Sequence, residues 1–303
     1  MTGNTPPKYP KGTPRKHHYI PRGYLAGFCG SSEERLALFD RVRNSYRDRQ
    51  RVLDVAHIKD YYAFEVDGDL NFDVERALGD IESGALPVIA KIDARQSIDG
   101  DERYALSLYT AFQHTRTPAF QNTSETMSSI LTQKLIAMAP EPVDGESMTE
   151  AQIAVELGLE MDRRATLRLM LGISPQIAEL LYERDWVIAR RPDDKSSFIT
   201  TDSPFCLIPG PDYVPQLFRG VGISTPGIIK TIPLSQSSVL LITEPGQGMV
   251  DLTLTRDQVR GFNIAIAAQC KNLVFGRDMP LVQRIVKESQ VDKSQWRVPI
   301  GSN

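Results

Sequence analysis

Apolar residues recur at helical spacing over residues 73–93, and two acidic residues interrupt the pattern. The spacing predicts an amphipathic helix whose apolar positions fall in one arc and whose remaining positions are solvated. Glu75 and Glu82 are seven residues apart and therefore nearly eclipsed, and both point inside the apolar arc or at its edge. Charged groups are rarely buried without a partner, so the pattern predicts that these two glutamates face other polar groups.

A second helix is predicted over 102–117, and it also carries polar groups on its apolar side. Gln113 and Arg116 project from that side one turn apart. Ser107, Thr110 and His114 fall on the opposite side, where we expect them to be solvated. An ion pair between Arg116 and one glutamate is therefore one interpretation of the pattern. Such a pair could be purely structural, because desolvation offsets much of the Coulomb gain of a buried pair.

A third helix is predicted over 255–272, where Thr255 and Gln258 have the spacing of a capping box. Asn263 lies within its apolar arc. Three helices with polar groups on the core side predict one shared buried polar cluster.

Short runs of β-forming residues lie on both sides of the helical middle of the chain. Residues 36–42 and 46–52 flank a predicted turn at Asn44, and further runs lie between 186 and 243. This order predicts an α+β fold with a predominantly helical core and a small, mostly antiparallel sheet formed by N-terminal and C-terminal strands. Parallel βαβ alternation and a glycine-rich phosphate fingerprint are both missing from the sequence, which argues against a Rossmann or P-loop enzyme.

Composition describes an ordinary globular chain of 303 residues, 41% apolar and 24% charged. Residues 1–16 are polar, proline-rich and basic, and they are predicted to form a flexible arm before a single α+β domain over 17–303. The formal net charge of −3 argues against a protein that is cationic overall, although a local basic patch can still bind nucleic acid.

The three cysteines form no paired motif, and the sequence shows neither a secretory signal nor an apolar run long enough to span a bilayer. These features predict a cytoplasmic protein without a membrane partner.

Two of the four histidines are adjacent, in His17-His18-Tyr19-Ile20-Pro21. Neighbouring imidazoles can supply a metal ligand or a general base. A similar string opens the site of some one-metal nucleases, but the further Asn and His that they need could only be Asn44 and His57, at wider spacings. The alternative is that one histidine donates to a backbone carbonyl while the other is solvated.

Asp202 ends a predicted strand at the start of a long Gly- and Pro-rich segment, 204–227. A carboxylate at this position suits a metal or substrate site, because function often gathers on loops held by rigid elements. It equally suits an Asx-type turn.

Five arginines occupy odd positions around the predicted hairpin turn: Arg41, Arg43, Arg47, Arg49 and Arg51. Period-2 spacing would give each strand one arginine-rich face, to which phosphate could bind while Tyr46 stacks on a base. The alternative is a plain solvated hairpin, whose charge Asp40 and Asp48 dilute.

Several short motifs follow one another in a recognisable order: His18-Tyr19-Ile20-Pro21, Tyr24-Leu25, Phe28, Tyr61-Tyr62, the helix with Glu75 and Glu82, Gln113, Arg116-Thr117-Pro118, Thr201-Asp202-Ser203-Pro204, Pro233-Leu234-Ser235 and the helix with Asn263. This order resembles a bacterial family catalogued as domain of unknown function number 4238. The resemblance implies a polar signature of His18, Glu75, Glu82, Gln113, Arg116, Asp202 and Asn263. Ser203 departs from the asparagine that the family often shows. The resemblance implies a role in anti-phage defence. It does not indicate a particular reaction.

Together these residues predict a hydrolase that acts on a phosphodiester or a nucleotide. His18 would be a general base or metal ligand, and Arg116 would stabilise charge on the phosphate. Glu75, Glu82 and Asp202 would hold Mg²⁺ or Mn²⁺, and the candidate catalytic set is completed by Gln113 and Asn263. One alternative is a non-catalytic binding or sensor module with a structural polar cluster. The other is a nucleic-acid-binding protein that uses the arginine hairpin and the basic arm.

Overall fold

The computed structural model describes residues 13–30, 33–67, 69–138, 149–159, 161–211, 213–215, 221–246 and 248–290. The helices are α1 (Arg22–Ala26), α2 (Asp73–Asp93), α3 (Gly100–Thr115), α4 (Pro118–Met138), α5 (Glu150–Glu156), α6 (Arg163–Tyr182), α7 (Arg256–Gln269) and α8 (Met279–Ser289), with a 3-10 turn at Val52–Asp54. The strands are β1 (Lys16–His18), β2 (Arg35–Asp40), β3 (Ser45–Arg51), β4 (His57–Lys59), β5 (Phe64–Val66), β6 (Asp69–Asn71), β7 (Asp185–Arg190), β8 (Thr200–Thr201), β9 (Cys206–Pro209), β10 (Ile228–Pro233), β11 (Ser238–Thr243), β12 (Met249–Thr253) and β13 (Leu273–Gly276).

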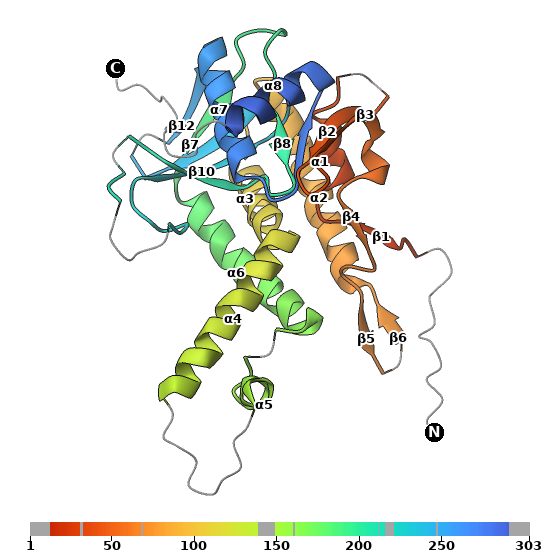
Figure 1. The fold of residues 1–303 in the computed structure, drawn as a ribbon. Helices are drawn as coiled ribbons and strands as arrows, with labels where there is room; N and C mark the ends of the chain where they lie inside the picture. The colour runs from red at the N-terminus through yellow and green to blue at the C-terminus, as the bar shows by residue number, and fades with distance from the viewer. Residues whose placement is uncertain are drawn as a thin grey trace, which may run out of the picture.

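Two larger sheets form the centre of the molecule (Figure 1). One has the order β3-β2-β13-β8 and is antiparallel throughout, so it joins strands from both ends of the chain. The other has the order β12-β7-β11-β10-β9 and is antiparallel except for the β12–β7 pair. The predicted α+β class is confirmed, and the second sheet enlarges the β part that the sequence indicated.

The central strands β10 and β11 of the five-stranded sheet are buried on both faces, whereas the edge strand β12 is largely exposed. Along β11, Leu240 and Ile242 join the core with α2, α3 and α6, while Val239 and Leu241 join the core with α7 and α8. A strand covered on both faces is apolar at every position, which explains the continuous run of β11.

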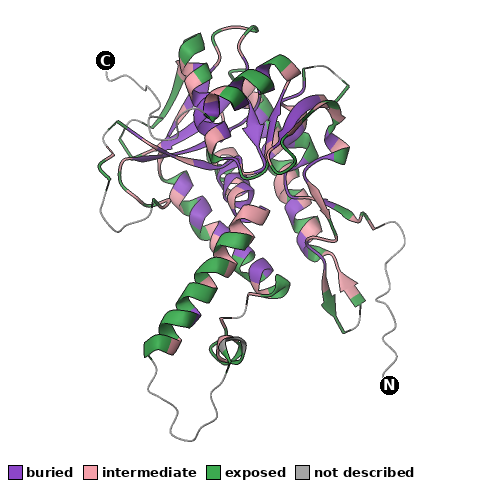
Figure 2. Ribbon diagram, in the orientation of Figure 1, coloured by how far each residue is buried: buried purple, intermediate pink, exposed green. Residues whose placement is uncertain are grey.

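Helix α3 lies in the interior and is buried on both sides (Figure 2). It begins at Gly100, two residues before the predicted start, because Asp99 and Glu102 form a capping box. Ser107 and Thr110, on the side predicted to be solvated, are fully buried. The expected solvated face is therefore wrong, since α2 and α6 both pack against this helix.

Helices α4 and α5 extend away from the sheets, and α4 is exposed along most of its length (Figure 2). Within the described ranges, no helix has the length and apolar character needed to cross a bilayer.

At the end of the predicted flexible arm over 1–16, residues 15 and 16 contact the segment 54–60. Lys16 opens β1, which pairs with β4, and Arg15 and Lys16 form ion pairs with Asp60 and Asp54. Residues 1–12 lie outside the described part of the chain. The assignment of 17–303 to a single domain stays a prediction.

Candidate functional site

A cavity of about 730 Å³ lies between β1, α1 and α2, and we call it the α2 cavity. It is lined by Pro14, Arg15, Lys16, His18, Arg22, Gly23, Leu53, Glu75, Gly79, Glu82, Ser83, Leu86 and Arg116. Four of the predicted site residues are therefore together: His18, Glu75, Glu82 and Arg116.

The backbone of α1 approaches α2 closely on one side of this cavity. A Cβ at Gly23 would overlap the end of the Leu86 side chain, so a larger residue there would displace that leucine. On α2 itself, Glu75, Gly79 and Glu82 follow at helical spacing and face the same cavity. The sequence thus places both carboxylates on one helix face and leaves open space between them.

Arg116 is the most heavily bonded group of the cavity, with only 3% of its side chain exposed. Its Nη1 donates to Glu82 Oε1 at 2.7 Å, its Nη2 to the carbonyl of His18 at 2.8 Å, and its Nε to the Tyr62 hydroxyl at 3.2 Å. Burial alone would lower the pKa of Arg116, but the contacts with Tyr62 and Glu82 outweigh it and raise the pKa. This residue ties β1, α2 and the end of α3 together as a permanent cation.

Glu75 differs from Glu82 because its inner oxygen has no hydrogen-bond partner. Its Oε2 is buried and unpaired within the described part of the chain, and the nearest basic atom, Nδ1 of His17, lies 3.9 Å away. Burial raises the pKa of Glu75 to about 7, since the lowering effect of Arg116 is smaller and Glu82 raises it further. Glu75 therefore exchanges a proton near neutral pH while the carboxylate beside it is held by an arginine.

The two adjacent histidines have different environments. His17 is fully buried, accepts the backbone N–H of Tyr62 at Nδ1 (3.0 Å) and donates from Nε2 to the carbonyl of Pro14 (3.2 Å). It is therefore neutral and structural. His18 donates from Nε2 to the carbonyl of Leu53 at 3.2 Å, and no partner is found for its Nδ1 among the described residues. Burial lowers the pKa of His18 to about 4, so its free nitrogen is a neutral acceptor.

Basic side chains surround the carboxylates of the α2 cavity. Arg15 and Lys16 pair with aspartates, whereas Arg22 has no acidic partner in the portion of the chain that the structure describes. Arg22 is exposed at the first position of α1. An anionic group entering the cavity would therefore meet an unpaired guanidinium.

The predicted metal ligands do not form one group. Asp202 is outside the α2 cavity, and its two oxygens accept the backbone N–H groups of Lys271 (3.1 Å) and Asn272 (2.8 Å). Its pKa is raised, because burial outweighs these hydrogen bonds. Across the described ranges, no set of three or more His, Cys, Asp and Glu side chains is placed to hold an ion. The expected Mg²⁺ or Mn²⁺ site does not fit the residues found here, because Asp202 closes a turn and Glu82 is paired with Arg116.

Asn263 also lies apart from the α2 cavity, contrary to the expected shared cluster. It is buried, accepts the backbone N–H of Ile199 at 3.1 Å and donates to the carbonyl of Ser197 at 2.8 Å. Gln113 is also buried, does not line the cavity, and donates to the Tyr109 hydroxyl at 2.6 Å. Its Oε1 is buried without a partner among the described atoms.

The arginine hairpin forms as predicted, with Asn44 in the left-handed region at its turn. A bulge shifts the register, so that Arg47 faces Leu38 but Gln50 faces Leu36. The regular arginine faces are therefore wrong. Arg43 and Arg47 pair with Asp40, Arg49 pairs with Glu33, and Arg41 donates to the carbonyl of Ala267.

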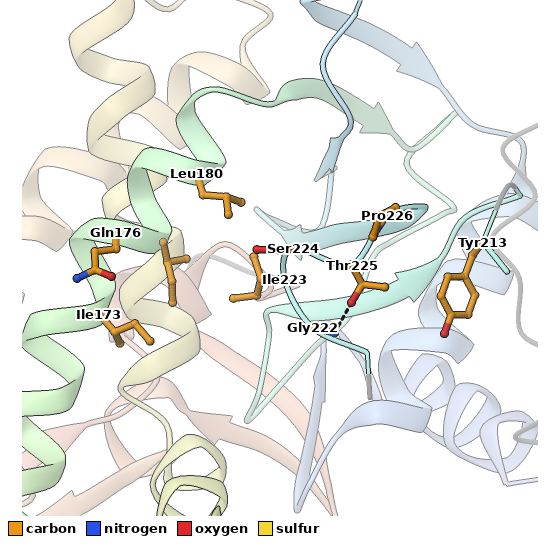
Figure 3. A pocket seen from close by; sticks show the side chains of 10 residues that line it. Ile173, Gln176, Leu180, Tyr213, Gly222, Ile223, Ser224, Thr225 and Pro226 are labelled. Atoms are coloured by element: carbon orange, nitrogen blue, oxygen red, sulfur yellow. Dashed lines mark hydrogen bonds between the residues drawn. The ribbon is translucent and has the colours of Figure 1, made fainter. Parts of the chain in front are cut away.

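A further cavity, of about 620 Å³, lies between α6 and residues 222–226 (Figure 3). Ile173, Ile177 and Leu180 of α6 line it together with Ile223. Its described lining contains no carboxylate, imidazole or basic group, so it offers nothing for acid–base chemistry.

Among the residues that were not in the predicted site, Arg22 and Leu53 line the α2 cavity and Tyr62 holds Arg116. Burial raises the pKa of Tyr62 to about 12, and its hydroxyl donates to the carbonyl of Arg116 while accepting from the same side chain. Tyr62 lies in the Tyr61-Tyr62 motif, and Arg22 directly follows His17–Pro21. Both could have been found from those motifs, whereas nothing in the sequence marks the carbonyl of Leu53.

Comparison with known proteins gives a family but no characterised relative. No curated protein matches the chain, and no solved structure matches it. The family model described as protein of unknown function (DUF4238) matches residues 16–279, a span that includes all the residues lining the α2 cavity except Pro14 and Arg15. The chain therefore belongs to this DUF4238 family.

Proposed function

We propose that the α2 cavity is the active site of a hydrolase that acts on a small phosphodiester or a nucleotide, with Glu75 as its general acid–base. The observation that carries this proposal is the buried, unpaired Oε2 of Glu75 in the wall of a basic cavity. A pKa near 7 suits proton transfer at neutral pH, because both protonation states are then populated.

Ionised Glu75 would take a proton from water as the water oxygen attacks phosphorus. The proton would then pass from Glu75 to the leaving oxygen as the phosphorus–oxygen ester bond breaks, which restores the carboxylate. Arg22 would bind a phosphate oxygen directly. Arg116 would stabilise the developing charge through its fixed positive charge, since its contacts with Glu82, Tyr62 and His18 prevent it from moving.

The test is the hydrolysis of bis(p-nitrophenyl) phosphate and a panel of dinucleotides by the full chain. Glu75→Gln should lower kcat by about 10²–10⁴-fold, the usual contribution of a general acid–base. Asp80→Asn, on the exposed side of the same helix, is the matched control and should keep full activity. Hydrolysis that survives Glu75→Gln would contradict the assignment, and a chain that hydrolyses none of these esters would contradict the substrate class.

The extensive bonding of Arg116 favours a second candidate function, a binding or sensor module. In that case the cavity would hold an anionic ligand at Arg22 without turnover, and the Arg116–Glu82 pair would only maintain its shape. Arg22→Gln would then weaken ligand binding, while Glu75→Gln would leave it unchanged. In either case we propose a cytoplasmic role in phage defence, as the family resemblance implies.

A further inference from the structure

A separate cavity of about 810 Å³ lies beside the start of α4, and we call it the α4 cavity. It is enclosed by the end of α3, the first turns of α4, strand β9 and the segment after α7. No residue lines both the α4 cavity and the α2 cavity. The geometry points to the α4 cavity as a binding site for a nucleoside monophosphate or a ligand of the same chemistry, a flat ring joined to an anion.

The charge of the α4 cavity favours an anion. Arg41 and Lys271 line it, and no carboxylate does so within the described residues. Arg41 is partly buried and held in place by a hydrogen bond from its Nη2 to the carbonyl of Ala267 at 3.1 Å. Lys271 is exposed, and its side chain takes part in no ion pair that the structure shows for the described residues. No carboxylate of the described cavity lining therefore neutralises Arg41 or Lys271. The other arginines of the hairpin that form ion pairs, by contrast, have acidic partners.

Asp202 fixes the position of this charge. Its carboxylate accepts the backbone N–H groups of Lys271 and Asn272, which holds the turn that carries the lysine. Ser203 follows Asp202 and lines the cavity directly. The Thr201–Pro204 motif therefore contributes to this second cavity and not to the first.

The apolar part of the cavity is aromatic. His114 lies 5.0 Å from the ring of Phe205 and 5.5 Å from the ring of Phe120, measured between centroids, and all three residues line the cavity. The sequence pattern placed His114 on a solvated face, but it is half-buried between Phe120 of α4 and Phe205, which precedes β9. Burial keeps the imidazole neutral, and neither ring nitrogen has a protein partner among the described residues. One nitrogen is thus a free donor and the other a free acceptor, which suits the polar edge of a nucleobase.

Both features are needed for the assignment. The aromatic group would stack on a base, and the cations would bind a phosphate; base stacking and charged hydrogen bonds each contribute substantially to such binding. A ligand with only one of these parts should bind more weakly.

The experiment is a calorimetric titration of the full chain with the four ribonucleoside monophosphates, and with adenosine and inorganic phosphate separately. At least one monophosphate should bind saturably at millimolar concentration or below, and more tightly than either part alone. Lys271→Gln should weaken that binding about tenfold, the effect of one lost charged hydrogen bond. Phe120→Leu should also weaken it, because the stacking ring is lost.

Lys287→Gln, on the exposed side of α8, is the matched control and should bind like the unmodified chain. Glu75→Gln and Arg22→Gln should leave unchanged the binding that Lys271→Gln weakens, even if a nucleotide also binds in the α2 cavity, which separates the result from the fate of the proposed hydrolase. Absence of binding by all four monophosphates would overturn the inference. Equal affinity in Lys271→Gln would do so as well, and loss in Arg22→Gln alone would place the ligand in the α2 cavity instead.

Discussion

Buried polar groups behave differently in two regions of this molecule. Around α7 and β8, both polar atoms of the Asp202 side chain and both of the Asn263 side chain form hydrogen bonds with backbone groups of neighbouring segments. In the α2 cavity, Glu75 keeps an unpaired buried oxygen and His18 a free nitrogen. The first arrangement joins neighbouring segments, and every polar atom of the two side chains has a partner. Unused hydrogen-bonding capacity, and not burial alone, therefore distinguishes the proposed site from these structural contacts.

The largest expected effect on stability concerns Arg116, which lines the α2 cavity but is fully paired. It tests whether a paired side chain in that cavity is structural. Arg116→Met should lower the free energy of unfolding by about 3–5 kcal/mol, because Glu82 and the Tyr62 hydroxyl lose a buried partner. Denaturant titration measures this, with Arg76→Met on the exposed face of α2 as the control. Should the Arg116 variant be too unstable to study, Arg116→Lys keeps the charge and should show a smaller loss. An unchanged stability would mean that the network is not structural.

The second effect concerns the clamp between α7 and residues 197–199. Asn263→Ala removes both of its hydrogen bonds and leaves the backbone groups of Ser197 and Ile199 buried without partners. We expect a loss of about 2–4 kcal/mol in unfolding free energy. Gln283→Ala, an amide exposed on α8, should change stability only slightly. Similar values for the two variants would show that the clamp contributes little.

The third effect depends on pH and concerns Glu75. Its pKa is raised in the folded state, so the folded state binds the proton more tightly than the unfolded chain does. The resulting stabilisation is complete below the ordinary carboxyl pKa and is lost as the pH rises through about 7.

Glu75→Gln removes this loss. At pH 8 the free energy of unfolding of the variant should therefore exceed that of the unmodified chain by about 2–3 kcal/mol, while at pH 4 the two values should agree. Melting temperatures across this range provide the measurement, and Asp80→Asn should follow the unmodified chain. Parallel profiles for Glu75→Gln and the unmodified chain would show that this carboxyl titrates normally.

The smallest effect belongs to the hairpin. Arg49 and Glu33 form an exposed ion pair, and such pairs contribute at most about 1 kcal/mol. Arg49→Gln should therefore change the free energy of unfolding by less than that, as measured by denaturant titration. A larger loss of stability would mean that the substitution disturbs the left-handed backbone conformation at Arg49 and not only the ion pair.

Much of the local structure could be predicted from the sequence. Helices α2 and α7 and the β2–β3 hairpin lie where periodicity, the Thr255 capping box and Asn44 place them. The face of α3 could not be predicted in this way, because its polar Ser107 and Thr110 are covered by neighbouring helices. Four of the predicted site residues meet in the α2 cavity, but Asp202 and Asn263 do not.

Spacing along a few turns of chain was enough to predict α2, α7, the hairpin turn, the α+β class and the burial of Gln113, Arg116 and Asn263. The partners of these side chains depend on the folded chain. Arg116 meets Glu82 across 34 residues, Asn263 meets Ser197 across 66, and Asp202 meets Asn272 across 70. The physical reason is that hydrogen bonds depend on distances of about 3 Å between groups that chain folding brings together, and local periodicity carries no information about those distances.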